Sequence, residues 1–109
     1  MKFAIAVDGK QVATHFGRCE YYEIIDISDG QVTDRYRLDN PGHAPGELPQ
    51  LLSGEEVNCI VAGGMGPRAQ QLFAQMQITP ILGVSGQLDK VVSQIAADEL
   101  VAGEDQCVH

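Results

Sequence analysis

Two short segments of this chain are apolar at almost every position, and each ends at glycine. Residues 2–8 (KFAIAVD) are followed by Gly9, and residues 57–64 (VNCIVAGG) end in a pair of glycines. A strand with one face in solvent alternates apolar and polar residues, whereas a strand covered on both faces is apolar almost throughout. We therefore expect two buried strands in a sheet with helices on its faces, which points to an α/β fold.

A hairpin is expected between these two buried strands. Residues 21–28 (YYEIIDIS) and 31–38 (QVTDRYRL) flank Asp29-Gly30. This dipeptide tolerates the positive φ angles of a tight hairpin turn. The second of the two segments has one mostly apolar face and one polar face, a pattern typical of a strand with one wet side. We place residues 31–38 at an edge of the sheet.

The remaining segments supply the helices and the last strand. Two prolines and two glycines make residues 39–46 a loop. Helical patterns cover residues 47–56, 66–77 and 86–101, and residues 78–84 form a short strand. The prediction is one domain over residues 1–109, an α/β fold in which helices flank a mixed five-stranded sheet and the crossovers are right-handed.

Composition limits the possible partners and the compartment. The chain has 109 residues, and its formal charge of -8 would repel the phosphate backbone of a nucleic acid. Its three cysteines suggest no disulfide framework, which is typical of an intracellular protein with reduced thiols. The apolar run at the N-terminus is too short for a signal peptide or a membrane span. We expect a cytoplasmic protein with no nucleic-acid partner and no membrane association, and the sequence leaves its oligomeric state open.

The stretch THFGRC, residues 14–19, falls in the long loop expected after the first strand. In open α/β sheets, ligands bind beyond the carboxyl ends of the strands, where this loop lies together with residues 62–68 and 83–87. His15 and Cys19 could meet at one metal ion from such a loop. The alternative is an exposed histidine beside a small packed cysteine.

A second histidine and cysteine close the chain. Cys107 and His109 form a C-x-H ending, and side chains two residues apart point the same way in an extended segment. Imidazole and thiolate bind zinc or the iron of a sulfide cluster. The alternative is a frayed terminus. Cys59, inside an apolar strand, is expected to be a core residue.

The glycine-rich turn GGMGPR, residues 63–68, joins a strand to a helix. The N–H groups at the start of a helix attract anions, and Arg68 adds a positive charge there. The turn lacks the GK[ST] ending of a phosphate-binding P-loop and the spacing of a dinucleotide fingerprint. The alternative is that its glycines serve only a tight turn and a close approach of helix and sheet.

Taken together, the chain resembles the dinitrogenase iron-molybdenum cofactor biosynthesis family, whose members include small proteins similar to the cofactor carriers of nitrogenase assembly. The residues that carry the resemblance are KFAIAVD, the THFG segment, CEYYEIIDI, GGMGPRA and the cysteine-histidine ending.

The resemblance implies a ribonuclease H-like fold that binds an iron-sulfur-based cofactor or its precursor, together with donor and acceptor proteins of cofactor assembly. His15, before Phe-Gly, is the ligand that it implies first. The expected metal ligands are then His15, Cys19, Cys107 and His109, and the other expected cofactor-binding residues are Arg18, Gly64, Gly66 and Arg68, whose positive charge and N–H groups would offset the charge of a cluster.

Two other functions remain open from the sequence. The four metal-ligand candidates could form a zinc site, or a regulatory module that senses metal or redox state. A metal-dependent nuclease would begin at Asp8, at the end of the first strand, but a two-metal site needs several carboxylates and the next buried strand ends in AGG. We therefore expect a binding protein and no enzyme.

Overall fold

The structure, a computed structural model, describes residues 1–42 and 47–99. Strands and helices alternate after an N-terminal antiparallel unit, as the sequence predicts. The elements are, in chain order, β1 (Lys2–Asp8), β2 (Gln11–Val12), a single 3₁₀ turn η1 (Phe16–Arg18), β3 (Tyr21–Ser28), β4 (Gln31–Asp39), α1 (Glu47–Gly54), β5 (Cys59–Val61), α2 (Pro67–Gln75), β6 (Thr79–Ile81) and α3 (Leu88–Ala96).

The sheet is mixed, with the strand order β4-β3-β1-β5-β6. β3 runs antiparallel to both β1 and β4, whereas β5 lies parallel to β1 and to β6. In the register, Ile5 pairs with Glu23 on one side and with Val61 on the other. The predicted mixed α/β sheet is confirmed, and all five expected strands are present.

The sheet has a sixth strand, so the predicted number of five is wrong. β2 lies in the segment that we expected to be a loop, and it pairs antiparallel with β1 through Val7–Val12 and Asp8–Gln11. Gly9 has a φ of 63°, a left-handed conformation that lets the chain reverse directly after β1. A strand of two residues is too short to show an alternation of apolar and polar side chains, so the sequence pattern did not predict β2.

The hairpin between β3 and β4 is confirmed. Asp29 and Gly30 have φ angles of 53° and 75°, the left-handed values that a tight two-residue hairpin turn requires. β4 lies at one edge of the sheet and is mostly exposed, as its alternating pattern predicts.

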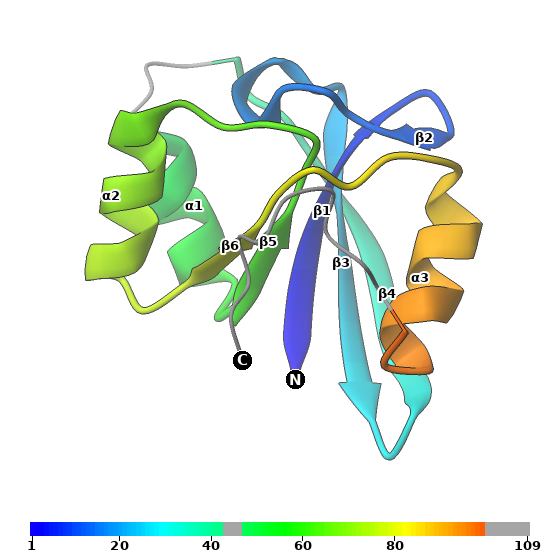
Figure 1. The fold of residues 1–109 in the computed structure, drawn as a ribbon. Coiled ribbons are helices and arrows are strands. Elements are labelled where there is room, and N and C mark those ends of the chain that lie inside the picture. Colours follow the sequence, from blue (N-terminus) through cyan, green and yellow to red (C-terminus); the bar gives the residue numbers. More distant parts are fainter. Residues whose placement is uncertain (43–46, 100–109) are drawn as a thin grey trace.

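Two helices cover one face of the sheet and one covers the other (Figure 1). Alternate residues of β1 point to opposite faces, so Ala4 and Ala6 pack under α1 and α2, whereas Ile5 and Val7 pack under α3. The two central strands are thus buried from both sides, as their continuous apolar runs predict.

Several elements are shorter than the sequence predicts. Residues 57–64 pair only over Cys59–Val61, because Gly63 leaves the ladder and its N–H donates to the carbonyl of Ala13 at 2.8 Å. The last helix ends at Ala96, and Asp98 has a φ of 59°, which is incompatible with a further helical turn. None of the helices in the described ranges is long and apolar enough to cross a membrane.

Candidate functional site

Three connections meet at the carboxyl ends of the central strands (Figure 1). The N–H of Phe16 donates to the carbonyl of Gly64 at 2.9 Å, and the N–H of Gly83 donates to the carbonyl of Gly63 at 2.9 Å. The N–H of Val12 reaches the carbonyl of Gly86, also at 2.9 Å. We call residues 13–18, 63–66 and 83–86 together the strand-end junction. It is the place where a ligand is expected in an open α/β sheet.

Gly63 allows the first two of these connections to touch. A Cβ atom at this position would lie 2.9 Å from the Cα of Thr14 and 3.1 Å from the carbonyl oxygen of Ala13. A Cβ on Gly64 would meet the carbonyl of Thr14 at 3.2 Å. The backbones are therefore packed directly against each other, which supports the close-approach role of the glycines.

Phe16 anchors the histidine-bearing turn to the core. Its ring packs edge-on against Phe73 of α2, with centroids 5.1 Å apart, and at 5.4 Å from Tyr22 of β3. The hydroxyl of Tyr22 donates to the carbonyl of Phe16 at 2.9 Å. The turn that follows His15 is thus held from inside by a buried ring and by hydrogen bonds.

His15 and Arg18 flank the anchor and remain exposed. His15 occupies the N-cap position of η1 with an extended backbone, and its side chain makes no capping hydrogen bond. Arg18 takes part in none of the ion pairs formed within the described residues. An imidazole and a guanidinium are therefore presented at the junction with their polar atoms available for a ligand.

The glycine-rich turn before α2 faces the same junction with unused donors. Within residues 1–42 and 47–99, the N–H groups of Gly64, Met65 and Gly66 have no hydrogen-bond acceptor. The side chain of Gln70 donates to the carbonyl of Met65 at 2.9 Å and steadies the turn. A Cβ on Gly66 would meet nothing within 4 Å, so this glycine borders open space.

Arg68 lies in the first turn of α2, directly after Pro67 at the start of the helix. Its side chain is exposed and has no carboxylate partner in the part of the chain that the structure describes. The N-terminus of a helix and a cation together favour a negatively charged group. The hydrogen bond between Phe16 and Gly64 joins the turn that bears His15 and Arg18 to the glycine-rich turn before Arg68, and a shared ligand at these residues stays a prediction.

Cys19 is set apart from this surface. The residue is 5% exposed and packs in the core cluster that also holds Phe16 and Tyr22. Burial, which disfavours the thiolate, raises the pKa of the Cys19 thiol. Asn40 donates to the Cys19 carbonyl at 2.7 Å and holds the segment in place. This environment favours a packed thiol, the alternative reading of the motif, and metal ligation by Cys19 stays a prediction.

Cys107 and His109 lie outside the described residues, as does any contact between them and His15. Among residues 1–42 and 47–99, no three histidine, cysteine or acidic side chains converge on a point that could hold a metal ion. Of the four predicted metal ligands, the structure therefore places one, His15, on the junction surface.

Sequence reasoning missed the residues that build the junction from within. Phe16 and Tyr22 were not singled out, although Phe16 follows His15 directly and Tyr22 lies in the hairpin strand. A large aromatic residue inside a glycine-containing loop is the available signal, since loops seldom carry one without a core to receive it. For the glycines of residues 63–66 the sequence suggested a close approach of helix and sheet, whereas the backbone that Gly63 approaches is that of Ala13 and Thr14.

Comparisons with known proteins agree with this architecture. The uncharacterized protein MJ0580 of Methanocaldococcus jannaschii is 31% identical over 83 residues, which cover 72% of this chain and 70% of the relative. The crystal structure of PH0822 superposes with a TM-score of 0.89 at 26% identity over 97% of each chain. The apo form of the orange protein from Desulfovibrio gigas shares the fold alone, with a TM-score of 0.76 at 19% identity over 93% of this chain and 91% of that one.

A model of the dinitrogenase iron-molybdenum cofactor family matches residues 1–98, a range that includes the whole strand-end junction. The family resemblance drawn from the sequence is thereby confirmed, and the chain belongs to the dinitrogenase iron-molybdenum cofactor family.

Proposed function

We propose that this protein binds and carries an iron-sulfur-based cofactor, or its precursor, during assembly of the iron-molybdenum cofactor of dinitrogenase. The family match over residues 1–98 is the observation that carries the proposal. It implies exchange with proteins that donate and accept the cluster, and it favours the ribonuclease H-like class for the fold. A cytoplasmic location remains the prediction made from the cysteine content.

The strand-end junction has the chemistry that such cargo requires. Sulfide-rich clusters carry negative charge, which Arg18, Arg68 and the unused N–H groups of residues 64–66 would offset. His15 would supply the protein ligand, because its imidazole is exposed and uses no capping hydrogen bond. One protein ligand and a charged cradle suit transient binding, whereas a closed set of four ligands suits a permanent structural site.

A binding role also fits the distribution of carboxylates better than catalysis does. Asp8, where a nuclease site would begin, accepts a hydrogen bond from the N–H of Glu20 at 2.9 Å. The carboxylate of Glu20 in turn accepts one from the N–H of Gly9 at 2.6 Å. These contacts tie the two acids to the backbone around β2. We therefore assign them a structural role and propose no enzymatic activity.

The zinc or redox-sensing alternative would rest on Cys19, Cys107 and His109 in addition to His15. Cys19 would have to leave the core and lose a proton that its environment retains. A cluster carrier that binds its cargo through His15 needs neither step. We therefore prefer the carrier, and the metal content of the loaded protein distinguishes the two functions.

The test is anaerobic loading of the purified protein with extracted iron-molybdenum cofactor, followed by gel filtration and measurement of iron and zinc. We expect iron to co-elute with the wild type and to be largely lost in His15→Ala. The matched control is Gln75→Ala, an exposed change at the far end of α2 that should retain iron. Equal iron in His15→Ala and wild type would refute the ligand assignment. Stoichiometric zinc without iron would favour the alternative function.

A further inference from the structure

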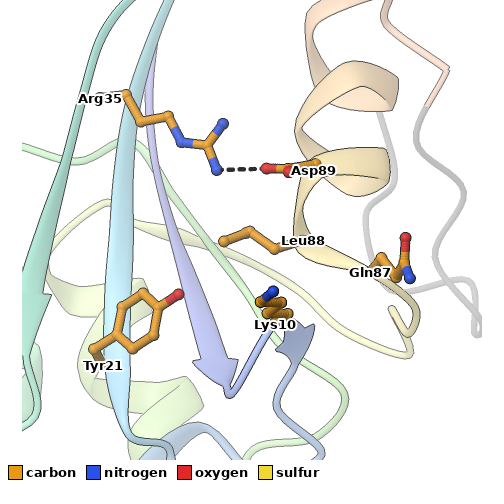
Figure 2. Close-up of a pocket in the computed structure, with 6 residues that line it drawn as sticks. All are labelled: Lys10, Tyr21, Arg35, Gln87, Leu88 and Asp89. Atoms are coloured by element: carbon orange, nitrogen blue, oxygen red, sulfur yellow. Dashed lines mark hydrogen bonds and ion pairs between the residues drawn. The ribbon is translucent and has the colours of Figure 1, made fainter.

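A polar cavity of about 330 Å³ lies on the α3 face of the sheet. The side chains that line it are Lys10, Tyr21, Arg35, Gln87, Leu88 and Asp89 (Figure 2). Arg35 reaches across to α3, where its Nη2 donates to Oδ1 of Asp89 at 2.8 Å, and its Nε donates to the carboxylate of Glu23. The charges of Lys10 and Arg35 are balanced by those of Glu23 and Asp89, so we assign no ligand to this cavity.

A second polar network is centred on Asn40, the residue that follows β4, and it reaches the turn η1. Its Nδ2 donates to the carbonyl of Cys19 at 2.7 Å and makes a longer contact of 3.4 Å with the carbonyl of Gly17. Its Oδ1 accepts the N–H of Gly42 at 2.9 Å. Because the oxygen faces this N–H, the network assigns the nitrogen of the Asn40 amide to the carbonyls of the turn.

Gly17 is the part of the turn with the greatest conformational freedom. It is exposed, and a Cβ atom there would meet nothing within 4 Å, so packing does not restrict it. The residue before it is anchored, because the ring of Phe16 is buried and its carbonyl accepts the hydroxyl of Tyr22 at 2.9 Å. On the far side, the N–H of Glu20 donates to the carbonyl of Val7 at 3.0 Å. Residues 17–19 form the link between these two anchors.

Arg18 lies in the middle of this link. Its side chain is exposed and forms no ion pair within the described residues, and its N–H reaches the carbonyl of His15 only at 3.4 Å. An amide nitrogen carries two N–H donors, so Asn40 contacts the carbonyls of Gly17 and Cys19 on the two sides of Arg18 with one group. The direction of the Arg18 backbone therefore depends on Asn40.

We propose that Asn40 is a positioning residue, which holds Arg18 in place for anionic cargo at the strand-end junction. This inference rests on the proposed function. A cationic residue whose backbone is fixed before the cargo arrives loses less conformational entropy on binding. Both ends of the Asn40 amide are bonded within the protein, so Asn40 acts through Arg18 and does not ligate the cargo itself.

The first test measures the rate of iron release from protein loaded with extracted iron-molybdenum cofactor. We expect Asn40→Ala to release iron about fivefold faster and Arg18→Met about tenfold faster than the wild type. The double variant should release it no faster than Arg18→Met, because residues that act through one group are not additive. The matched control is Asn58→Ala, which removes an amide that accepts the N–H of Lys2 at 2.8 Å at the opposite end of the sheet. It should release iron like the wild type.

The second test needs no cargo and uses the backbone order parameters of residues 17–19, measured by nuclear magnetic resonance. We expect them to fall from about 0.85 toward about 0.6 in Asn40→Ala and to stay unchanged in Asn58→Ala. Asn40→Asp, which keeps the acceptor for Gly42 but loses the two donors, should lose order in the same residues.

The two tests separate this inference from the proposed function. Unchanged order parameters in Asn40→Ala would overturn the positioning role. Equal acceleration of iron release by Asn40→Ala in the wild type and in Arg18→Met would also overturn it, since Asn40 would then not act through Arg18. If the wild type retains no iron, the proposed function fails, and the order parameters still decide whether Asn40 holds the turn.

Discussion

The two faces of the sheet are built differently at the end that bears the loops. On the α1/α2 face, the apolar core continues past the strand ends, where Phe16 packs between Tyr22 and Phe73. On the α3 face, Val12 and Val84 also extend the core at this end, but the core is interrupted at Glu23, between Tyr21 and Ile25 of β3, where Glu23 and Arg35 form an ion pair. The loops therefore pack on apolar side chains on the α1/α2 face, whereas they border a polar cavity on the α3 face.

β3 shows how one strand serves both faces. Its residues alternate, so Tyr22 and Ile24 enter the core under α1 and α2, whereas Tyr21 and Glu23 face α3. The buried hydroxyl of Tyr22 is satisfied by the backbone of the histidine turn, whereas Glu23 is satisfied by a side chain. Hydrophobic burial gives the larger free energy, so we expect the turn that bears His15 to be the more strongly held of the two surfaces.

The largest loss of stability should follow removal of the Phe16 ring on the α1/α2 face. Phe16→Ala deletes a buried aromatic side chain that is 4% exposed, and such changes cost about 3–5 kcal/mol of the free energy of unfolding. Urea denaturation measures this loss. Phe16→Leu, which keeps most of the apolar volume, should cost much less. If Phe16→Ala loses under about 1 kcal/mol, the turn is not held by packing.

The sequence contained most of the information for the fold and less for the junction. Continuous apolar runs and the Asp29-Gly30 turn predicted the two central strands and the hairpin. A strand buried on both faces needs apolar residues at nearly every position, and positive φ angles favour residues such as aspartate and glycine. β2 has no such sequence pattern, since its pairing depends on the reversal of the chain at Gly9 and on contacts with β1.

For the candidate site, the sequence placed the THFGRC stretch and the glycine-rich turn at the same end of the sheet, and the structure joins their backbones through Phe16 and Gly64, while the ligand role of His15 and Arg18 stays a prediction. It could not show that Cys19 faces the core, because a loop has no period from which to read the side-chain direction. The cavity beside α3 was also missed. Arg35 and Asp89 are 54 positions apart in sequence, and only the sheet order and helix placement bring them into contact.

The second prediction tests whether close backbone contact holds the junction. Gly63→Ala would place a Cβ 2.9 Å from the Cα of Thr14, and backbone on both sides must shift to accept it, which should cost about 1–3 kcal/mol. Gly66→Ala is the matched control, because its Cβ would meet nothing within 4 Å and its φ of -66° suits alanine. Differential scanning calorimetry should show a lower melting temperature for Gly63→Ala alone. Equal melting temperatures would contradict the contact.

The smallest effect is expected at the exposed half of the ion-pair network on the α3 face. Arg35→Met leaves the Glu23 carboxylate, 11% exposed, without its partner, and an unpaired buried polar group costs about 1–3 kcal/mol. Asp89→Asn removes the other half of the network, but the Asp89 side chain is 86% exposed, so we expect a loss of under about 1 kcal/mol. Urea unfolding at low and high salt separates the two, because the exposed pair is screened more strongly than the buried one. If both variants lose the same free energy of unfolding, with the same dependence on salt, Glu23 is solvated in the folded protein. The Arg35–Glu23 pair would then contribute no more to stability than the exposed Arg35–Asp89 pair.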